Sequence, residues 1–143
     1  MTEESVVVFT SITTDELNVT YHENLVEDPR VGAVVSFGGV VRNHDSRAGV
    51  TRLDYEGHPR AAEILSDIAT DMASRFPGVR IAVSHRIGTL EVGHVALAAA
   101  VASAHRAEAF GCCAQLVEEI KARLPIWKNQ FFDDGTQEWV GSL

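Results

Sequence analysis

The order of predicted elements along the chain indicates an α+β domain. That order is strands, a helix, two strands, a second helix and a final hairpin, which differs from the regular strand–helix alternation of a βαβ dinucleotide-binding fold. The sequence also lacks the phosphate-binding glycine loops of the Rossmann and Walker types. Its 143 residues, 45% of them hydrophobic, suit one compact core, so a single domain over residues 1–143 is expected.

The first part of the chain is predicted to form strands around one short helix. Apolar, β-branched runs predict strands at Ser5–Ile12, Val31–Arg42 and Arg52–Glu56, with a short helix near Tyr21–Val26. Thr13–Glu16 is expected to be a turn or a helix start. We expect Gly38-Gly39 to break the second strand, and the polar loop that follows, residues 43–49, to be mobile.

The next part of the chain is predicted to hold a long helix, two strands and, near its end, a hairpin. These elements are expected at Pro59–Phe76 for the helix, Val79–His85 and Val95–Ala102 for the strands, and Gln130–Val140 for the hairpin. Pro59 suits the start of the helix, and Pro77-Gly78 suits its end. Gly88–Gly93 is expected to connect the two strands, and Asp134-Gly135 is typical of a hairpin turn.

A second long helix is predicted at Ala107–Leu124, and it carries a lysine on its apolar side. At 100° per residue, the apolar stripe consists of Phe110, Cys113, Ala114, Val117, Ile120 and Leu124. Lys121 falls in the middle of this stripe, whereas Glu119 and Arg123 lie on the opposite side. A lysine so placed either extends to the edge of the apolar surface or sits in a desolvated pocket, where burial lowers the pKa of its amine. The second case gives a reactive amine.

Both lysines of the chain, Lys121 and Lys128, lie in one octapeptide, while the other ten basic residues are arginines. An amine differs from a guanidinium because it can lose its proton and act as a nucleophile or base. The octapeptide is therefore the candidate active site, with Pro125 ending the helix and Trp127 forming an apolar wall beside Lys128. The alternative, that an arginine-rich composition has left two neighbouring lysines by coincidence, stays open.

Further cations are expected at the start of the lysine-bearing helix and at the end of a strand. Ser103 is the expected N-cap, which places His105 and Arg106 in the first turn. Free backbone amides there favour an anion, so a bound phosphate or carboxylate would reconcile the two cations with the helix dipole. The alternative is that both side chains bend into solvent or pair with a carboxylate. Arg42, just after the double glycine, is the third candidate.

Composition and charge exclude several classes of partner. The net charge is −8 and no basic run exceeds two residues, which disfavours nucleic acids and anionic membranes. The longest apolar stretch, Val95–Ala102, is too short to span a membrane. Met1–Ser5 lacks the features of a signal peptide, so a cytoplasmic protein is expected.

The cysteines and most histidines indicate neither a disulfide nor a metal site. Cys112 and Cys113 are adjacent, a spacing that suits neither; Cys113 is expected in the core and Cys112 at the surface. The remaining histidines lack the spacing of metal ligands, and a structural role is expected for His22, His44, His58, His85 and His94. No metal and no cofactor are expected.

Four motifs, taken together, resemble one protein family. They are Phe37-Gly-Gly-Val-Val-Arg42-Asn-His, His85-Arg-Ile-Gly-Thr-Leu, Ser103-Ala-His-Arg106 and Lys121-Ala-Arg-Leu-Pro-Ile-Trp-Lys128. Their joint occurrence in this order, across roughly Val31–Val140, is similar to the large, catalytic subunit of molybdopterin synthase. The resemblance implies an α/β hammerhead-type single domain with an additional antiparallel β subdomain.

The resemblance also implies a reaction and its partners. It implies a homodimer that binds a small ubiquitin-like sulfur-carrier subunit at each end, giving a heterotetramer. By the same resemblance, the carrier's Gly-Gly tail ends in a thiocarboxylate and enters a pocket of the large subunit. Two sulfurs are then expected to pass to cyclic pyranopterin monophosphate, opening its cyclic phosphate and building the dithiolene of molybdopterin.

Roles for individual residues of the pocket follow from the resemblance alone. Lys121 is expected at the end of the carrier tail and Lys128 close to the pterin, both with acid–base and charge-stabilising roles. Phe37 and Arg42 are expected to line the same pocket. Val117 is expected beside the tail, at a position where the family usually has a methionine.

The resemblance also assigns the cations at the start of the second helix. His105 and Arg106 are expected to bind the phosphate of the substrate by reaching across from the neighbouring subunit. The loop after Arg42 is expected to be a lid. His94 departs from the family, which usually has an acidic residue there.

Two functions of other classes stay open. A non-catalytic partner that only docks a ubiquitin-like Gly-Gly tail is suggested by Gly38-Gly39 and the apolar pocket, although both lysines argue against it. A Schiff-base enzyme acting on a carbonyl substrate would use Lys121 as its nucleophile.

Overall fold

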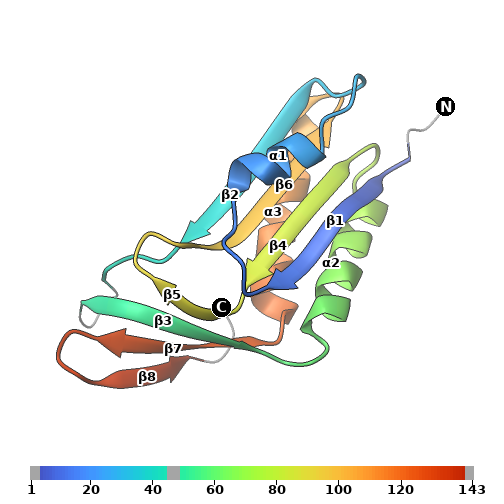
Figure 1. Cartoon of the computed structure of the whole chain (residues 1–143). Helices are drawn as coiled ribbons and strands as arrows, with labels where there is room; N and C mark the ends of the chain where they lie inside the picture. The colour runs from blue at the N-terminus through green and yellow to red at the C-terminus, as the bar shows by residue number, and fades with distance from the viewer. Residues whose placement is uncertain (1–3, 45–48, 141–143) are drawn as a thin grey trace.

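The computed structural model describes residues 4–44 and 49–140, which form two four-stranded sheets and three helices (Figure 1). The first sheet has the strand order β1-β4-β6-β2, with bounds Val6–Thr13, Arg80–Arg86, Val95–Ser103 and Ala33–Val40. Strands β1 and β4 are parallel, and the other neighbours are antiparallel. The predicted α+β class is confirmed.

Helices cover both faces of the first sheet. Helices α2 (Ala61–Arg75) and α3 (Arg106–Arg123) pack on one face, and the short helix α1 (Val19–Leu25) lies across the other (Figure 1). Strand β6 is buried on both sides as a result. Ala99 and Val101 belong to the main core, whereas Ala100 and Ala102 belong to the smaller cluster under α1. Burial on both faces of the strand explains why the sequence Val95–Ala102 is apolar without interruption.

The second sheet is antiparallel throughout and extends from one end of the first (Figure 1). Its strand order is β5-β3-β7-β8, with bounds Gly88–Glu91, Val50–Gly57, Ile126–Phe132 and Gln137–Val140. The predicted Asp134-Gly135 turn joins β7 to β8, and Gly135 has φ +87°, a left-handed conformation that favours glycine. The additional antiparallel β subdomain is therefore present as expected.

Two predictions about glycine-containing segments were wrong. Gly88–Gly93 was expected to be a connection, but it contains the short strand β5. Gly38-Gly39 does not break its strand, because β2 runs through both residues with a bulge only after Gly39. A Cβ at Gly38 would lie 3.1 Å from Cγ2 of Val19, so the missing side chain of this glycine leaves room for the Val19 side chain of α1.

The predicted ends of the long helices need two corrections. Helix α2 begins at Ala61 after an N-cap at Arg60, so Pro59 precedes the helix instead of starting it. Helix α3 has His105 as its N-cap, with no side-chain capping bond. Ser103 is not the cap, because its hydroxyl donates to the carbonyl of His105 at 2.5 Å and is thus turned away from the helix amides.

The buried face of α3 is also turned relative to the predicted stripe. Cys112 and Leu116 are fully buried, whereas Phe110 is 60% exposed. Helix α3 packs against α2 as well as the sheet, and this second contact shifts its buried side toward Cys112. The prediction that Cys112 is an exposed thiol was therefore wrong, while Cys113 lies in the core as expected.

The predicted loop after Arg42 lies mostly outside the described residues, since residues 45–48 are not described. His44 and Gly49 on either side of them form an isolated antiparallel bridge.

A helix that could cross a membrane is absent from residues 4–44 and 49–140.

Candidate active site

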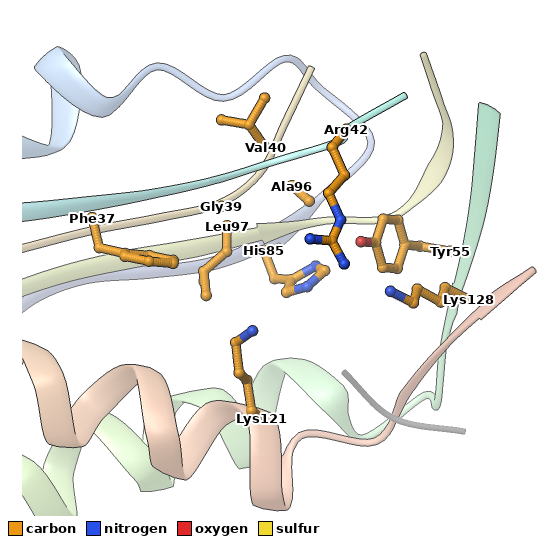
Figure 2. A pocket seen from close by; sticks show the side chains of 10 residues that line it. All are labelled: Phe37, Gly39, Val40, Arg42, Tyr55, His85, Ala96, Leu97, Lys121 and Lys128. Atoms are coloured by element: carbon orange, nitrogen blue, oxygen red, sulfur yellow. The ribbon is translucent and has the colours of Figure 1, made fainter. Parts of the chain in front are cut away.

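A cavity of about 330 Å³ opens where the two sheets meet the C-terminal end of α3. Its lining comes from five strands, from α3 and from the second residue after β2: Phe37, Gly39, Val40, Arg42, Tyr55, His85, Ala96, Leu97, Lys121 and Lys128 (Figure 2). Four of the residues predicted from the sequence therefore meet here, namely Phe37, Arg42, Lys121 and Lys128.

Among the residues that the structure describes, the lining of the cavity includes three cationic side chains and no carboxylate. Elsewhere the arginines of the chain tend to be paired; Arg30 lies 2.8 Å from Asp28 and Arg123 lies 2.8 Å from Asp71. In the described part of the chain, neither Arg42 nor Lys121 has a carboxylate within salt-bridge distance. These two cations lie beside Lys128 in one cavity of a chain with net charge −8, and this arrangement favours an anionic ligand.

Lys121 lies in the last turn of α3, and its amine points into the cavity toward His85 (Figure 2). The residue is exposed. In the single chain, the Lys121 side chain therefore extends to the edge of the apolar surface and does not sit in a desolvated pocket.

Lys128 enters the cavity because of the register of the second sheet. It pairs with Tyr55 across the β3–β7 ladder, so both side chains leave the sheet on the same face. Trp127 points to the opposite face, because side chains alternate along a strand, and it is 40% exposed. The prediction that Trp127 forms the wall beside Lys128 was wrong; the ring of Tyr55 occupies that place (Figure 2).

His85 forms the floor of the cavity on β4 and is 1% exposed. Its Nδ1 lies 2.7 Å from the carbonyl oxygen of Arg86. Its ring packs edge-on against Tyr55, with centroids 5.2 Å apart. Burial lowers the pKa of the imidazole to about 4, and burial also raises the pKa of the Tyr55 hydroxyl to about 12. Both groups are therefore neutral beside three cations.

The predicted structural role is confirmed for His22, but it does not account fully for the position of His85. The ring of His22 lies between the Asn18 carbonyl, 2.8 Å from Nδ1, and the Ser84 hydroxyl, 2.7 Å from Nε2. His85 is also buried and hydrogen-bonded, yet it faces the cavity. Among the described residues, no three His, Cys, Asp or Glu side chains gather in a way that could hold a metal ion.

Three other predicted site residues do not line this cavity. His105 and Arg106 are exposed at the first turn of α3, about 22 Å along the helix axis from Lys121 at 1.5 Å per residue. Their side chains do not reach the cavity of their own chain. Val117 is 8% exposed and packs in the main core, one turn before Lys121.

Tyr55 and His85 are the functional candidates that the sequence reasoning missed. The alternation of Leu53 and Tyr55 along a strand with polar neighbours gave a signal that Tyr55 faces inward. His85, which follows the apolar run Ile81–Val83 on the same strand, gave a similar signal that its side chain faces inward. Neither signal identifies which cavity such a side chain faces, because that depends on how the two sheets meet.

Comparison with known proteins gives consistent matches over most of the chain. Residues 12–123 match the protein family described as MoaE protein. The chain is 36% identical over 132 residues to the molybdopterin synthase catalytic subunit of Nostoc, covering 91% of this chain and 80% of that protein. The crystal structure of molybdopterin synthase from Staphylococcus aureus superposes with a TM-score of 0.85 at 30% identity, over 91% of this chain and 95% of that one.

A more distant structure shares the fold alone. It is described as a protein–protein complex of subunits 1 and 2 of the molybdopterin-converting factor from Helicobacter pylori. It matches with a TM-score of 0.71 at 18% identity and covers 92% of this chain and 88% of that chain.

Proposed function

The chain belongs to the MoaE protein family, whose relatives are named catalytic subunits of molybdopterin synthase, and on this premise we propose how it performs sulfur transfer. The sulfur comes from the C-terminal thiocarboxylate of a small ubiquitin-like carrier. Its acceptor is cyclic pyranopterin monophosphate, and the product is the dithiolene of molybdopterin. The single observation that carries this proposal is the cavity that holds Lys121, Lys128 and Arg42, with no carboxylate among its described lining residues.

The charges of the cavity suit both reactants. A thiocarboxylate and a phosphate are anions, and ammonium and guanidinium groups stabilise them through charge-assisted hydrogen bonds. Lys121, at the open edge, is placed to meet the end of the carrier tail. Lys128, deeper on the second sheet, is placed to meet the pterin, with Arg42 and Phe37 beside it. The two amines then serve as proton donors and acceptors and as counter-charges.

A second copy of the chain completes the site in this proposal. His105 and Arg106 lie too far along α3 to reach their own cavity, so they bind the phosphate of a substrate held in the neighbouring subunit. The assembly is a homodimer with one carrier at each end, which makes a heterotetramer. In this arrangement the carrier's Gly-Gly tail passes Lys121, and Val117 supports it from the core below.

The proposal is tested by measuring dithiolene formation with thiocarboxylated carrier and cyclic pyranopterin monophosphate. Wild type is compared with Lys121→Arg, which keeps the positive charge but replaces the amine with a guanidinium that cannot act as a base. We expect product from the wild type and a loss of about 10²-fold or more in the variant. Arg123→Lys, on the same helix but outside the cavity, is the matched control and is expected to retain activity.

The same experiment separates sulfur transfer from simple docking. Carrier binding is measured by calorimetry beside the activity assay. Wild-type protein that binds the carrier but gives no dithiolene would contradict the proposal and support the docking partner. Equal activity of the wild type and Lys121→Arg would show that Lys121 contributes only its positive charge.

A further inference from the structure

Among the described residues that line the cavity, His85 is a neutral imidazole beside three cationic groups. Its ring lies between Tyr55 and the amine of Lys121 (Figure 2). The edge-on packing against Tyr55, at an interplanar angle of 76°, restricts rotation of the ring. The imidazole is thus held in one orientation beneath the space where the reactants meet.

The hydrogen bond of His85 fixes its tautomer. A backbone carbonyl only accepts hydrogen bonds, so Nδ1, 2.7 Å from the Arg86 oxygen, must carry the proton. In the neutral ring Nε2 then holds a lone pair. In residues 4–44 and 49–140, no protein group hydrogen-bonds to Nε2, because the Arg86 carbonyl, at Nδ1, is the only hydrogen-bond partner of this ring.

The other polar side chains of the cavity are hydrogen-bond donors. Ammonium and guanidinium groups cannot accept, which leaves Lys121, Lys128 and Arg42 as donors when charged. The Tyr55 hydroxyl keeps its proton because burial raises its pKa to about 12. While both amines are charged, the described lining group that can accept a proton at the floor of the cavity is therefore Nε2 of His85.

Sulfur transfer contains such a step, and this inference rests on the proposed function. When the carrier's thiocarboxylate sulfur bonds to a carbon of the pterin, the product is a thioester that links the two molecules. Release of the carrier breaks the bond between the carrier's acyl carbon and sulfur. The carrier leaves as a carboxylate, so it must gain one oxygen atom, and water is the source of that oxygen.

We propose that Nε2 of His85 binds and deprotonates the water that cleaves this thioester. Nε2 takes one proton as the water oxygen adds to the acyl carbon, and the developing oxyanion is stabilised by the nearby cations. The carbon–sulfur bond then breaks, its electron pair leaves on sulfur, and the imidazolium returns its proton to that sulfur. The new carboxylic acid loses its remaining proton to solvent. Bound anions in the cavity make the transient imidazolium more favourable.

His85→Gln and His85→Asn form a matched pair for the test. The asparagine amide takes the place of Nδ1 and keeps a donor for the Arg86 carbonyl, whereas the glutamine side chain extends to the position of Nε2 without a basic nitrogen. With thiocarboxylated carrier and cyclic pyranopterin monophosphate, both variants are expected to lose turnover by about 10²-fold or more. Intact mass spectrometry is expected to show a carrier–pterin thioester that accumulates and is cleaved by hydroxylamine.

Several outcomes would overturn the inference. Wild-type turnover by His85→Gln would remove the need for a base, and a loss of turnover without the thioester would place His85 at an earlier step. If neither variant folds, nitrogen-15 spectra of wild-type histidines decide, because a proton on Nε2 instead of Nδ1 contradicts the proposed acceptor. Failure of the proposed function is distinct, since the wild type itself would then give neither dithiolene nor thioester.

Discussion

Lys128 and Tyr55 face each other across the antiparallel ladder between β7 and β3, and both enter the cavity. Their relative positions are set by backbone hydrogen bonds of the sheet and not by a flexible loop. Lys128, which is half-buried, consequently lies beside the ring of Tyr55 in the cavity (Figure 2).

Replacing Lys128 is expected to remove activity while leaving the fold intact. Lys128→Ala should lower turnover by about 10²-fold or more, because the charge proposed to bind the pterin is lost. Lys128→Arg is the control that retains the charge, and it should bind the substrate more tightly than the alanine variant. Turnover is compared in the dithiolene assay, and the melting temperature checks folding. Wild-type turnover of Lys128→Ala would contradict the role given to this amine.

Lys121→Ala tests whether the lysine on α3 has any structural role. Its side chain is exposed and has no carboxylate partner in the described part of the chain, so the free energy of unfolding should change by no more than about 0.5 kcal/mol. Activity is expected to be lost. Denaturant unfolding followed by circular dichroism measures the first quantity. A destabilisation of several kcal/mol would show that Lys121 supports the fold and would make its loss of activity uninformative.

Mixing two inactive variants tests whether Arg106 acts on the neighbouring chain. Lys121→Ala and Arg106→Ala are each expected to be inactive, the second mainly through weaker substrate binding. In a mixed dimer, one of the two sites contains neither substitution if Arg106 reaches across the interface. After exchange of subunits at equal concentrations, activity should return to about one quarter of wild type, from random pairing in a two-fold dimer. No recovery despite proven exchange would place both residues in one site.

The two cysteines are expected to be unreactive in the folded protein. Burial raises the pKa of Cys112 to about 12 and that of Cys113 to about 11, so both stay thiols at neutral pH. A thiol reagent at pH 8 should detect neither group in the native protein and both after unfolding. Because the folded pKa values lie above the unfolded one, stability should fall as pH rises above about 9. A fast native reaction would contradict the burial of Cys112.

His85 should destabilise the folded chain in acid. Burial lowers its pKa from 6.5 to about 4, so the unfolded state binds a proton first as the pH falls through this range. Stability present above pH 6.5 is therefore lost between pH 6.5 and 4, by up to about 3 kcal/mol at 1.36 kcal/mol per unit. Urea unfolding of wild type and His85→Gln measures the difference, which should narrow toward pH 4. A pH-independent difference would show that the imidazole is not buried in its neutral form.

The sequence predicted the long elements well and a short one badly. Strand β6 and the two long helices have apolar patterns that extend over nine residues or more. Strand β5 has four residues and begins at Gly88 with φ +93°, so neither a pattern nor a strand preference marks it. It forms because β3 offers an edge with which it can pair.

Four residues that were expected in one pocket lie together in the structure, while their roles in the reaction stay predictions. Phe37, Arg42, Lys121 and Lys128 do meet in one cavity. The local predictions failed where packing between elements decides the outcome. The turn of α3 toward α2 buries Cys112, and the meeting of the two sheets brings Tyr55 and His85 together, neither of which is encoded in a short window of sequence.

The cavity has walls from both sheets, and this gives the protein a way to make activity conditional on complete folding. A chain in which only the first sheet has formed presents His85 and Phe37 but lacks the groups supplied by β3 and β7. Such a chain cannot engage an anionic ligand with its full set of charges. Any ligand that binds the complete cavity in turn stabilises, by mass action, the state in which both sheets are formed and lie together. Reactants are thus expected to hold the two sheets together, and local opening between them would be the first motion that saturating ligand suppresses.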